Sequence, residues 1–316
     1  RYYKLSECLT PFPNTDTLGT IGSEERDIVK IINEYSDRNL FTLFSKDKSV
    51  KEFLENVTPE KIEKFIRPFI ERRINKCLTI SRDENIPVYY QKKKSATLHS
   101  EDQLYLSGEN AEPVFRFIRD EEQTTYSLSL ETGGKFIDLR NSSLEILCIS
   151  PCVIRDEYRV LFVSKIDGSK LKPFLTKVSI VIPKKTELKY FGGFILNTIN
   201  NFKVEGTGFE LVEYSPEKEV ILDLETGLNG LPVMILQYKY GDFKIYANDL
   251  SITFTSFEGK NDDFIFRKFH RDFNWEKGCR TRLGELGFFS DDDINFFPVS
   301  SDISRKPDIY SFLEII

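Results

Sequence analysis

The chain has 316 residues, of which 40% are hydrophobic and 30% charged, and its formal net charge is −6. This apolar content supports a folded core and excludes an intrinsically disordered chain, and the length is typical of about two domains. The acidic balance argues against a protein that coats nucleic acid, although a local basic patch stays compatible with it.

The chain begins at Arg1 and its only methionine is Met234, so we expect it to be a piece of a longer protein. Residues 308–316 have the pattern of a helix that would continue beyond Ile316. No run of about eighteen apolar residues is present, and we therefore expect no membrane-spanning helix.

The cysteines are odd in number and widely spaced, which predicts reduced thiols and a cytoplasmic protein. If residues 148–152 are extended, Cys148 and Cys152 lie about 13 Å apart, too far for a disulfide. Buried strand cysteines are favoured over metal ligands, because no second pair exists. The full set is Cys8, Cys77, Cys148, Cys152 and Cys279.

Residues 24–80 are expected to be helical, because apolar side chains recur there at helical spacing. Thr58 supplies an N-cap and Pro59 a first-turn proline for a helix whose apolar face runs from Ile62 to Cys77. Pro68 lies inside this run and is expected to kink the helix.

From about residue 86 to 183 the apolar period changes to two, which predicts short strands in a predominantly antiparallel sheet system. Turns are expected at Gly133-Gly134 and Asp167-Gly168. The strand candidates are 87–90, 103–106, 114–118, 126–130, 136–139, 144–149, 158–163 and 178–182.

A helix is expected to resume near Tyr190, and another to run from about Asp272 to Leu286 and end at Gly287. Asn229-Gly230 can form a turn between strands. The strands expected here are 220–224, 233–240, 243–247 and 264–266. The sequence thus predicts an α+β fold with a helical part at 1–82, a β-rich domain at 83–189 and an α+β domain at 190–316.

Motifs for chemistry are absent: the chain has no Gly-x-x-x-x-Gly-Lys-Ser/Thr, Gly-x-Gly-x-x-Gly or Gly-x-Ser-x-Gly pattern. The two histidines, His99 and His270, favour surface or hydrogen-bonded side chains over a metal site or triad. The acidic run at 290–293 lacks calcium-loop spacing and favours a solvated loop. No residue is therefore assigned a catalytic, cofactor-binding or metal-binding role.

Basic clusters are the remaining candidates, because affinity for DNA comes mostly from neutralisation of its phosphates. The alternative for each cluster is ordinary solvated surface, and the lysines of 167–174 are expected to face outward from a turn. The candidate phosphate contacts are Lys92, Lys93, Lys94, Arg267, Lys268 and Arg271.

The segment after Arg271 also has a purely structural interpretation. Asp272 stands at a helix start, where a carboxylate is favourable, and Glu276 and Arg280 are spaced to pair on that helix. Trp275 is expected to pack in the core rather than stack on a base.

Several segments together resemble the region that precedes the motor in bacterial Swi/Snf-type helicase-like ATPases, particularly those of the Bacteroidetes type. They are Phe-Arg-Phe-Ile-Arg at 115–119, Thr-Tyr-Ser-Leu at 125–128, Ile-Ser-Pro-Cys at 149–152, Ile-Asp-Gly-Ser-Lys-Leu-Lys-Pro-Phe at 166–174, Tyr-Phe-Gly-Gly-Phe at 190–194, Gly-Phe at 208–209, Gly-Leu-Pro-Val-Met-Ile-Leu-Gln-Tyr at 230–238, Arg-Asp-Phe-Asn-Trp-Glu at 271–276 and Leu-Gly-Phe at 286–288. Together they cover about residues 30–316 in the right order.

The resemblance implies a non-catalytic accessory or regulatory region that contacts double-stranded DNA or the ATPase motor of the same chain. Such a motor needs a phosphate loop and an Asp-Glu-x-His-like box, which would lie after Ile316 together with its ATP and Mg²⁺. The small zinc module of many relatives has no matching cysteine spacing here. Two alternatives stay open: a protein–protein interaction scaffold without a nucleic-acid role, and an enzyme of an unrecognised type.

Overall fold

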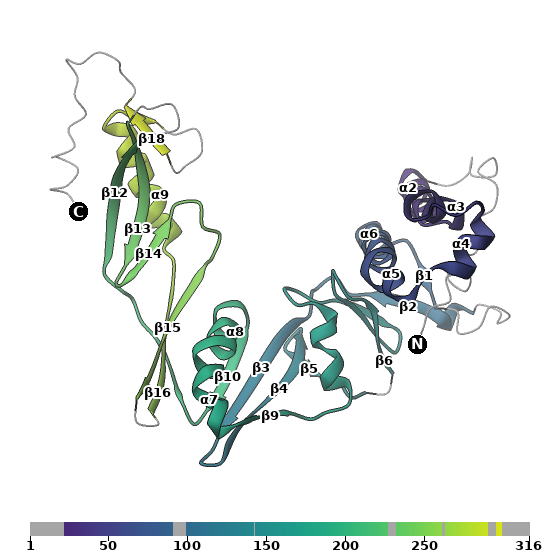
Figure 1. The fold of residues 1–316 in the computed structure, drawn as a ribbon, viewed down its shortest axis with the longest axis horizontal. Coiled ribbons are helices and arrows are strands. Elements are labelled where there is room, and N and C mark those ends of the chain that lie inside the picture. Colours follow the sequence, from purple (N-terminus) through teal and green to yellow (C-terminus); the bar gives the residue numbers. More distant parts are fainter. Residues whose placement is uncertain are drawn as a thin grey trace. The chain divides into compact units, whose positions relative to one another are not determined.

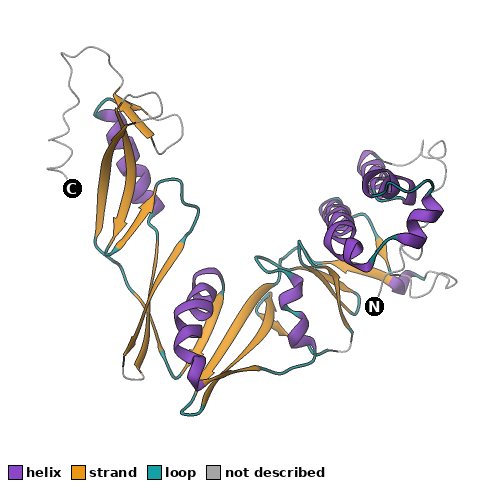
Figure 2. Cartoon of the chain, viewed as in Figure 1, coloured by secondary structure: helices purple, strands orange, loops and turns teal. Residues whose placement is uncertain are grey.

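The computed structural model describes residues 22–90, 99–141, 143–226, 232–260, 263–289 and 295–298. It confirms the predicted α+β class, with N-terminal helices between residues 23 and 83 followed by several mostly antiparallel sheets and a few helices (Figures 1 and 2). The chain divides into two compact units. Unit 1 comprises residues 1–184 and 202–205, and unit 2 comprises 185–201 and 206–316.

The predicted N-terminal helices form a small helical layer of unit 1. Leu40, Phe53 and Ile66 are buried at its centre, as their helical spacing indicated. The helical segments are α2 (Ser23–Glu34), α3 (Asp37–Phe44), α4 (Val50–Asn56), α5 (Pro59–Lys61), the π-helical η2 (Ile62–Ile66) and α6 (Arg67–Asp83).

The local signals around α5 and α6 act as predicted, with one difference. The Thr58 hydroxyl accepts a hydrogen bond from the Lys61 N–H at 3.3 Å, and Pro59 opens the helix. Pro68 stands in the first turn of α6, directly after the π-helical turn η2. Because proline has no N–H and crowds the preceding turn, the widened η2 turn accommodates it, and this π-helical turn is a feature that the sequence did not predict.

The first sheet of unit 1 packs against α6. Its strands lie in the order β1 (Val88–Tyr89), β2 (Gln103–Leu106), β8 (Arg159–Phe162), β7 (Val153–Asp156) and β6 (Leu144–Cys148). Only the β2–β8 pair of this sheet is parallel. Leu78 of α6 joins a core cluster with Leu104, Cys148 and Val160, because alternate residues of each strand face the helix.

The second sheet of unit 1 has the order β10 (Lys203–Thr207), β3 (Glu112–Arg119), β4 (Gln123–Thr132) and β5 (Lys135–Ile137), with β9 (Ile180–Pro183) also paired to β4. The predicted Gly133-Gly134 turn joins β4 to β5, and both glycines have positive φ. The predicted turn at 167–168 opens a 3₁₀ turn, η4 (Gly168–Lys170), whose lysine is exposed as expected.

A buried carboxylate fastens the helical layer to the first sheet. Glu71 of α6 accepts from Arg67 Nε at 2.7 Å and from the Ile149 N–H at 2.7 Å. Glu71 is buried, so these contacts form largely away from water. The interaction therefore fixes the β6–β7 turn against α6.

Unit 2 begins with a helical run over a three-stranded sheet. The run is α7 (Lys184–Tyr190), the π-helical η6 (Phe191–Ile195) and α8 (Leu196–Asn201). The sheet has the order β11 (Glu210–Glu213), β16 (Asp263–His270) and β15 (Thr253–Lys260), and β11 is parallel to β16. Phe191 packs against the rings of Phe209, Phe257, Phe264 and Phe266.

The second sheet of unit 2 carries α9 (Phe273–Glu285) along one face (Figure 1). Its strands are β12 (Lys218–Thr226), β13 (Pro232–Tyr240), β14 (Phe243–Tyr246), β18 (Asn295–Pro298) and β17 (Phe288–Phe289). The core includes Leu236, Tyr238 and Tyr240 of β13 with Leu283 of α9. As predicted, α9 is followed by Gly287, which has φ +90°.

The structure adds strands that the sequence pattern did not predict, namely β7, β10, β11, β15, β17 and β18. The predicted border at residue 189 falls inside the continuous helical run of α7 and η6. The helices before residue 83 belong to the same unit as the first two sheets. Three predicted features lie outside the described residues: the Asn229-Gly230 turn, the acidic run at 290–293 and the helix at 308–316.

We expect Glu71→Ala to lower the free energy of unfolding of unit 1 by about 3 kcal/mol, because it removes the buried carboxylate that accepts from Arg67 Nε and from the Ile149 N–H. Denaturation in urea, followed by circular dichroism, measures this loss. The matched control is Glu63→Ala, which removes the exposed partner of the same arginine and should cost less than about 0.5 kcal/mol. Equal losses in the two variants would contradict the role given to Glu71.

Candidate functional site

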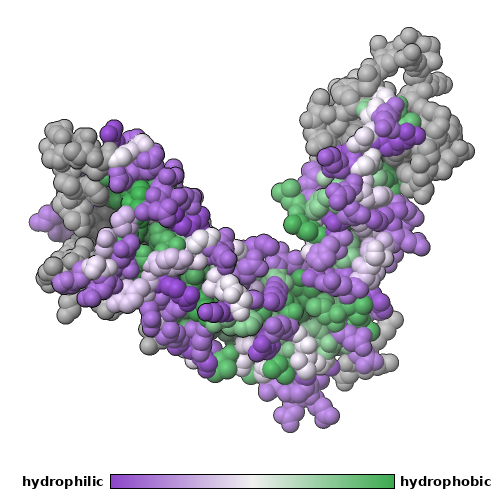
Figure 3. Space-filling model, turned by 180° about the vertical axis from the view of Figure 1, so that it is seen from behind, coloured by the Kyte–Doolittle hydropathy of each residue, from purple (hydrophilic) through white to green (hydrophobic). Residues whose placement is uncertain are grey.

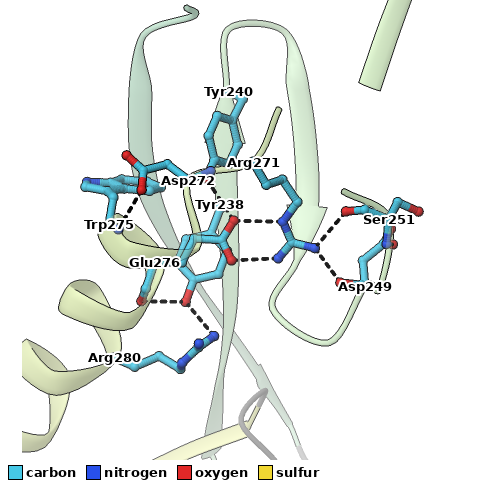
Figure 4. A network of polar contacts seen from close by, with 9 residues as sticks. All are labelled: Tyr238, Tyr240, Asp249, Ser251, Arg271, Asp272, Trp275, Glu276 and Arg280. Carbon is cyan, nitrogen blue, oxygen red and sulfur yellow. Dashed lines mark hydrogen bonds and ion pairs between the residues drawn. The ribbon is translucent and has the colours of Figure 1, made fainter. Parts of the chain in front are cut away.

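A buried ion pair joins the end of β16 to the first turn of α9 in unit 2 (Figure 4). Arg271 Nε and Nη2 each donate to one carboxylate oxygen of Glu276, both at 2.7 Å. The two side chains are 1% and 0% exposed. Asp272 accepts from the Trp275 N–H at 3.0 Å and so caps α9, as predicted, which places Glu276 in the turn nearest to Arg271.

Two tyrosines of β13 complete the polar network around Glu276. Tyr240 donates its hydroxyl to Glu276 Oε1 at 2.8 Å and accepts from the Asp272 N–H at 3.0 Å. Tyr238 donates to the Glu276 carbonyl at 3.1 Å and accepts from Arg280 Nη1 at 3.3 Å. Burial raises the pKa of both tyrosines above the usual range, so both hydroxyls remain protonated and able to donate.

Arg271 also holds the loop 247–252, which connects β14 to β15. Its Nη1 donates to the carbonyls of Asp249 and of Ser251, the latter at 3.3 Å. Its backbone N–H donates to the Ile252 carbonyl at 2.9 Å. Within the loop, the Ser251 N–H donates to Asp249 Oδ1 at 2.7 Å. The loop backbone is therefore fixed by hydrogen bonds at Asp249, Ser251 and Ile252.

This fixed loop presents apolar side chains to solvent. Leu250 is 91% exposed and Ile252 57% exposed, and Tyr246, which ends β14 just before the loop, and Phe273, which begins α9, are also exposed. We call these four residues the apolar tip. In Figure 3, which views the chain from behind, the loop forms a projection with a hydrophobic surface. A scattered exposed apolar residue is ordinary, but a group of them on a braced loop indicates a contact surface.

The network itself is saturated internally. The bonds named above use four of the five N–H donors of the Arg271 guanidinium. Glu276 is fully buried, and both of its carboxylate oxygens accept hydrogen bonds from within unit 2. The arrangement can therefore brace the loop, but it offers no carboxylate or base to a substrate.

Among the described residues, the structure does not bring the predicted phosphate contacts Arg267, Lys268 and Arg271 together on one surface. Lys92, Lys93 and Lys94 lie outside the described residues. Arg267 is exposed and pairs with Glu258 at 3.1 Å. Lys268 follows it on the strand, so it faces the other side of the sheet, where it lies 3.6 Å from Glu213.

Arg271 requires a correction, because its buried guanidinium is occupied by Glu276 and the loop carbonyls and does not face solvent. The expected pairing of Glu276 with Arg280 is also wrong. Glu276 pairs with Arg271 instead, because the planar guanidinium of Arg271 can donate to both carboxylate oxygens at once. Trp275 packs edge-on against Tyr238 and Tyr240, which confirms its predicted core role.

The cysteines of the described residues are free thiols. Cys148 and Cys152 are buried, but they stand at the two sides of the β6–β7 turn rather than on the extended segment assumed above. Burial raises the pKa of Cys152 to about 12, and the pKa values of Cys77 and Cys279 to about 11. These thiols are protonated near neutral pH and are weak nucleophiles there.

The histidines are exposed, as the sequence favoured, and His270 shares a hydrogen bond with the Thr253 hydroxyl at 3.0 Å. No group of three His, Cys, Asp or Glu side chains in the described parts of the chain could hold a metal ion. In the same parts, no helix is both long enough and apolar enough to cross a membrane.

No protein-family model, curated protein or solved structure matches the chain.

We expect Arg271→Ala to lower the free energy of unfolding of unit 2 by about 3 kcal/mol or more, because Glu276 would remain buried without its cation. Trp275 is the only tryptophan, so its fluorescence during urea denaturation reports on this unit. Hydrogen exchange at Ser251 should become faster in the same variant. Arg267→Ala, at an exposed position of the preceding strand β16, should change stability by less than about 0.5 kcal/mol. A comparable loss there would refute a special role for Arg271.

We also expect the stability of unit 2 to fall as pH rises above about 9, since unfolded cysteine and tyrosine titrate near 8.5 and 10. The unfolded chain then loses these protons while folded Cys279, with its pKa near 11, retains its own, which favours unfolding. Urea denaturation by tryptophan fluorescence between pH 8 and 11 measures the slope. Cys279→Ala should flatten it, whereas Thr281→Ala should leave it unchanged; identical slopes would contradict the account.

Proposed function

We propose that this chain is a non-catalytic protein-interaction module whose contact is the apolar tip. The observation that carries the proposal is Leu250, which is 91% exposed on a loop that a buried arginine holds in place. Interfaces gain most of their binding energy from a few apolar or aromatic anchors. A loop that is already ordered loses less conformational entropy on binding, so its anchors bind more tightly.

The geometry of the tip favours a particular kind of partner surface. Four side chains on a projection provide far less than the roughly 800 Å² that each partner contributes to a standard interface. A flat symmetric contact between two tips would therefore be weak. We propose instead that Leu250 inserts into an apolar pocket on a different protein, while residues around the loop form the polar rim.

The role as an accessory region of a Swi/Snf-like ATPase fits within this proposal, with the motor as the protein partner. The electrostatics favour a protein over DNA as the ligand of the described residues. Arg267 and Lys268 both lie beside carboxylates, and the whole chain carries a net charge of −6. Carboxylate neighbours reduce the gain from releasing counterions at phosphates.

A photo-crosslinking amino acid at position 250, in cells that naturally produce the protein, tests the proposal. We expect one defined protein adduct, identified by mass spectrometry, and no such adduct with the crosslinker at Lys244, which is exposed on β14. Purified partner should then bind the unmodified chain, and Leu250→Ser should weaken this binding about tenfold or more, as for an anchor residue.

Two results would overturn this function. One is the same set of adducts from positions 250 and 244, which would mean a non-specific surface. The other is flotation of the chain with lipid vesicles that depends on Leu250, which would make the tip a membrane contact. Leu250→Ser should fold normally, because an exposed side chain contributes little to stability, and tryptophan fluorescence verifies this.

A further inference from the structure

Strand β12 forms a long free edge of the second sheet of unit 2 (Figure 1). It pairs with β13 in one antiparallel register, which runs from Lys218 opposite Tyr240 to Thr226 opposite Pro232. No described strand pairs with its other edge. The edge of a sheet presents a row of unpaired N–H and C=O groups, so it can accept another extended chain as an additional strand.

This edge lacks the backbone features that usually prevent such pairing. The nine residues of β12 include no proline, and their register with β13 contains no bulge. Outside that pair, the backbone of β12 makes no hydrogen bond to a described residue. Natural edge strands are commonly very short, bulged or interrupted by proline. The outer edge of β12 is therefore open to pairing along its length.

The face of β12 that packs toward α9 favours apolar residues in an added strand. Val220 and Leu222 lie on this face and belong to the core that β12 and β13 share with α9. Val220 is 9% exposed, whereas Leu222 is only half-buried. Because side chains alternate along a strand, a partner with an apolar residue at every second position would extend this core.

The opposite face of β12 is acidic. Glu219 and Asp223 lie there, two positions on either side of Ile221. Glu219 accepts from Lys239 Nζ at 2.6 Å. Asp223 accepts from Gln237 Nε2 at 2.9 Å. Each carboxylate uses one oxygen in these bonds, and the second oxygen accepts no hydrogen bond from a described residue. A cation directly opposite in an added strand would pair with it, whereas an anion would be repelled.

The same acidic face disfavours a second copy of this chain as the added strand. Two copies of β12 would pair antiparallel about a two-fold axis near the middle of the strand. An axis at Ile221 places Glu219 opposite Asp223, and an axis at Asp223 places this residue opposite itself. An axis at Leu222 places Glu219 opposite position 225, which is also a glutamate. Like charges directly opposite each other destabilise a strand pair.

We infer that the free edge of β12 binds an extended segment of another protein in which apolar residues alternate with lysine or arginine. The segment adds to the sheet as a strand, with its apolar side chains toward α9 and its cations opposite Glu219 and Asp223. Backbone hydrogen bonds supply the affinity, and the acidic face excludes copies of the chain and admits basic partners. This surface shares no residue with the apolar tip, and the inference does not depend on the tip.

Two labelled peptides of about seven residues test the inference on the full chain by fluorescence polarisation. One alternates lysine with valine, and the other alternates glutamate with valine. We expect the basic peptide to bind about tenfold more tightly or better and to slow hydrogen exchange at the amides of 218–223. Equal affinities, no binding of either peptide at millimolar concentration, or slower exchange only in other segments overturns the inference. A dimer of the chain that protects these same amides also overturns it, because the edge then binds a second copy.

A charge reversal on the edge locates the binding. The double variant Glu219→Lys with Asp223→Lys should weaken binding of the basic peptide about tenfold and strengthen binding of the acidic peptide by a similar factor. Loss of folding cannot produce this gain, and the fluorescence of Trp275 verifies the fold.

The matched control is Glu258→Lys with Asp263→Lys, which makes the same charge change at two exposed residues of the other sheet of unit 2. It should alter either affinity by less than about twofold, since distant exposed charges are screened by salt. An equal effect in the control, or no gain in binding of the acidic peptide by the edge variant, overturns the site.

Discussion

The ion pair between Arg271 and Glu276 is the interaction on which the described part of unit 2 most depends. It joins the end of β16 to α9. Its carboxylate also accepts a hydrogen bond from a tyrosine of β13, and its guanidinium donates to carbonyls of the loop after β14. A buried pair adds little net stability when both partners are present, yet removal of one partner is costly. Its value here is specificity: one side chain fixes the positions of several separate segments.

The same arrangement recurs in unit 1 in a simpler form. There Glu71, on a helix, binds an arginine of its own helix and the backbone N–H of Ile149 in a distant turn. In unit 1 the buried glutamate holds a turn directly, and in unit 2 the buried Glu276 binds the arginine that holds the loop. Turns and loops have few apolar groups to bury, so a charged hydrogen bond is an effective way to order them.

Much of the fold could be predicted from local pattern, because helical and strand periods are local properties. The helices of 23–83 and the alternating strands β4, β12 and β13 are examples. Strand β11 was missed because all four of its side chains are exposed, which leaves no alternation. Arg271 was misread because its partners include a residue five positions ahead and carbonyls about twenty behind.

The chain passes between the two units more than once, so the gene segments that encode the units are interleaved. The chain leaves unit 1 at residue 184, contributes 185–201 to unit 2, returns for 202–205 and then leaves again. A gene segment that ended at 184 would lack β10 and expose an edge of β3, which invites aggregation. A segment that began at 206 would lack Phe191, the centre of its aromatic core. Neither unit is therefore a contiguous coding module, and recombination can transfer them intact only together.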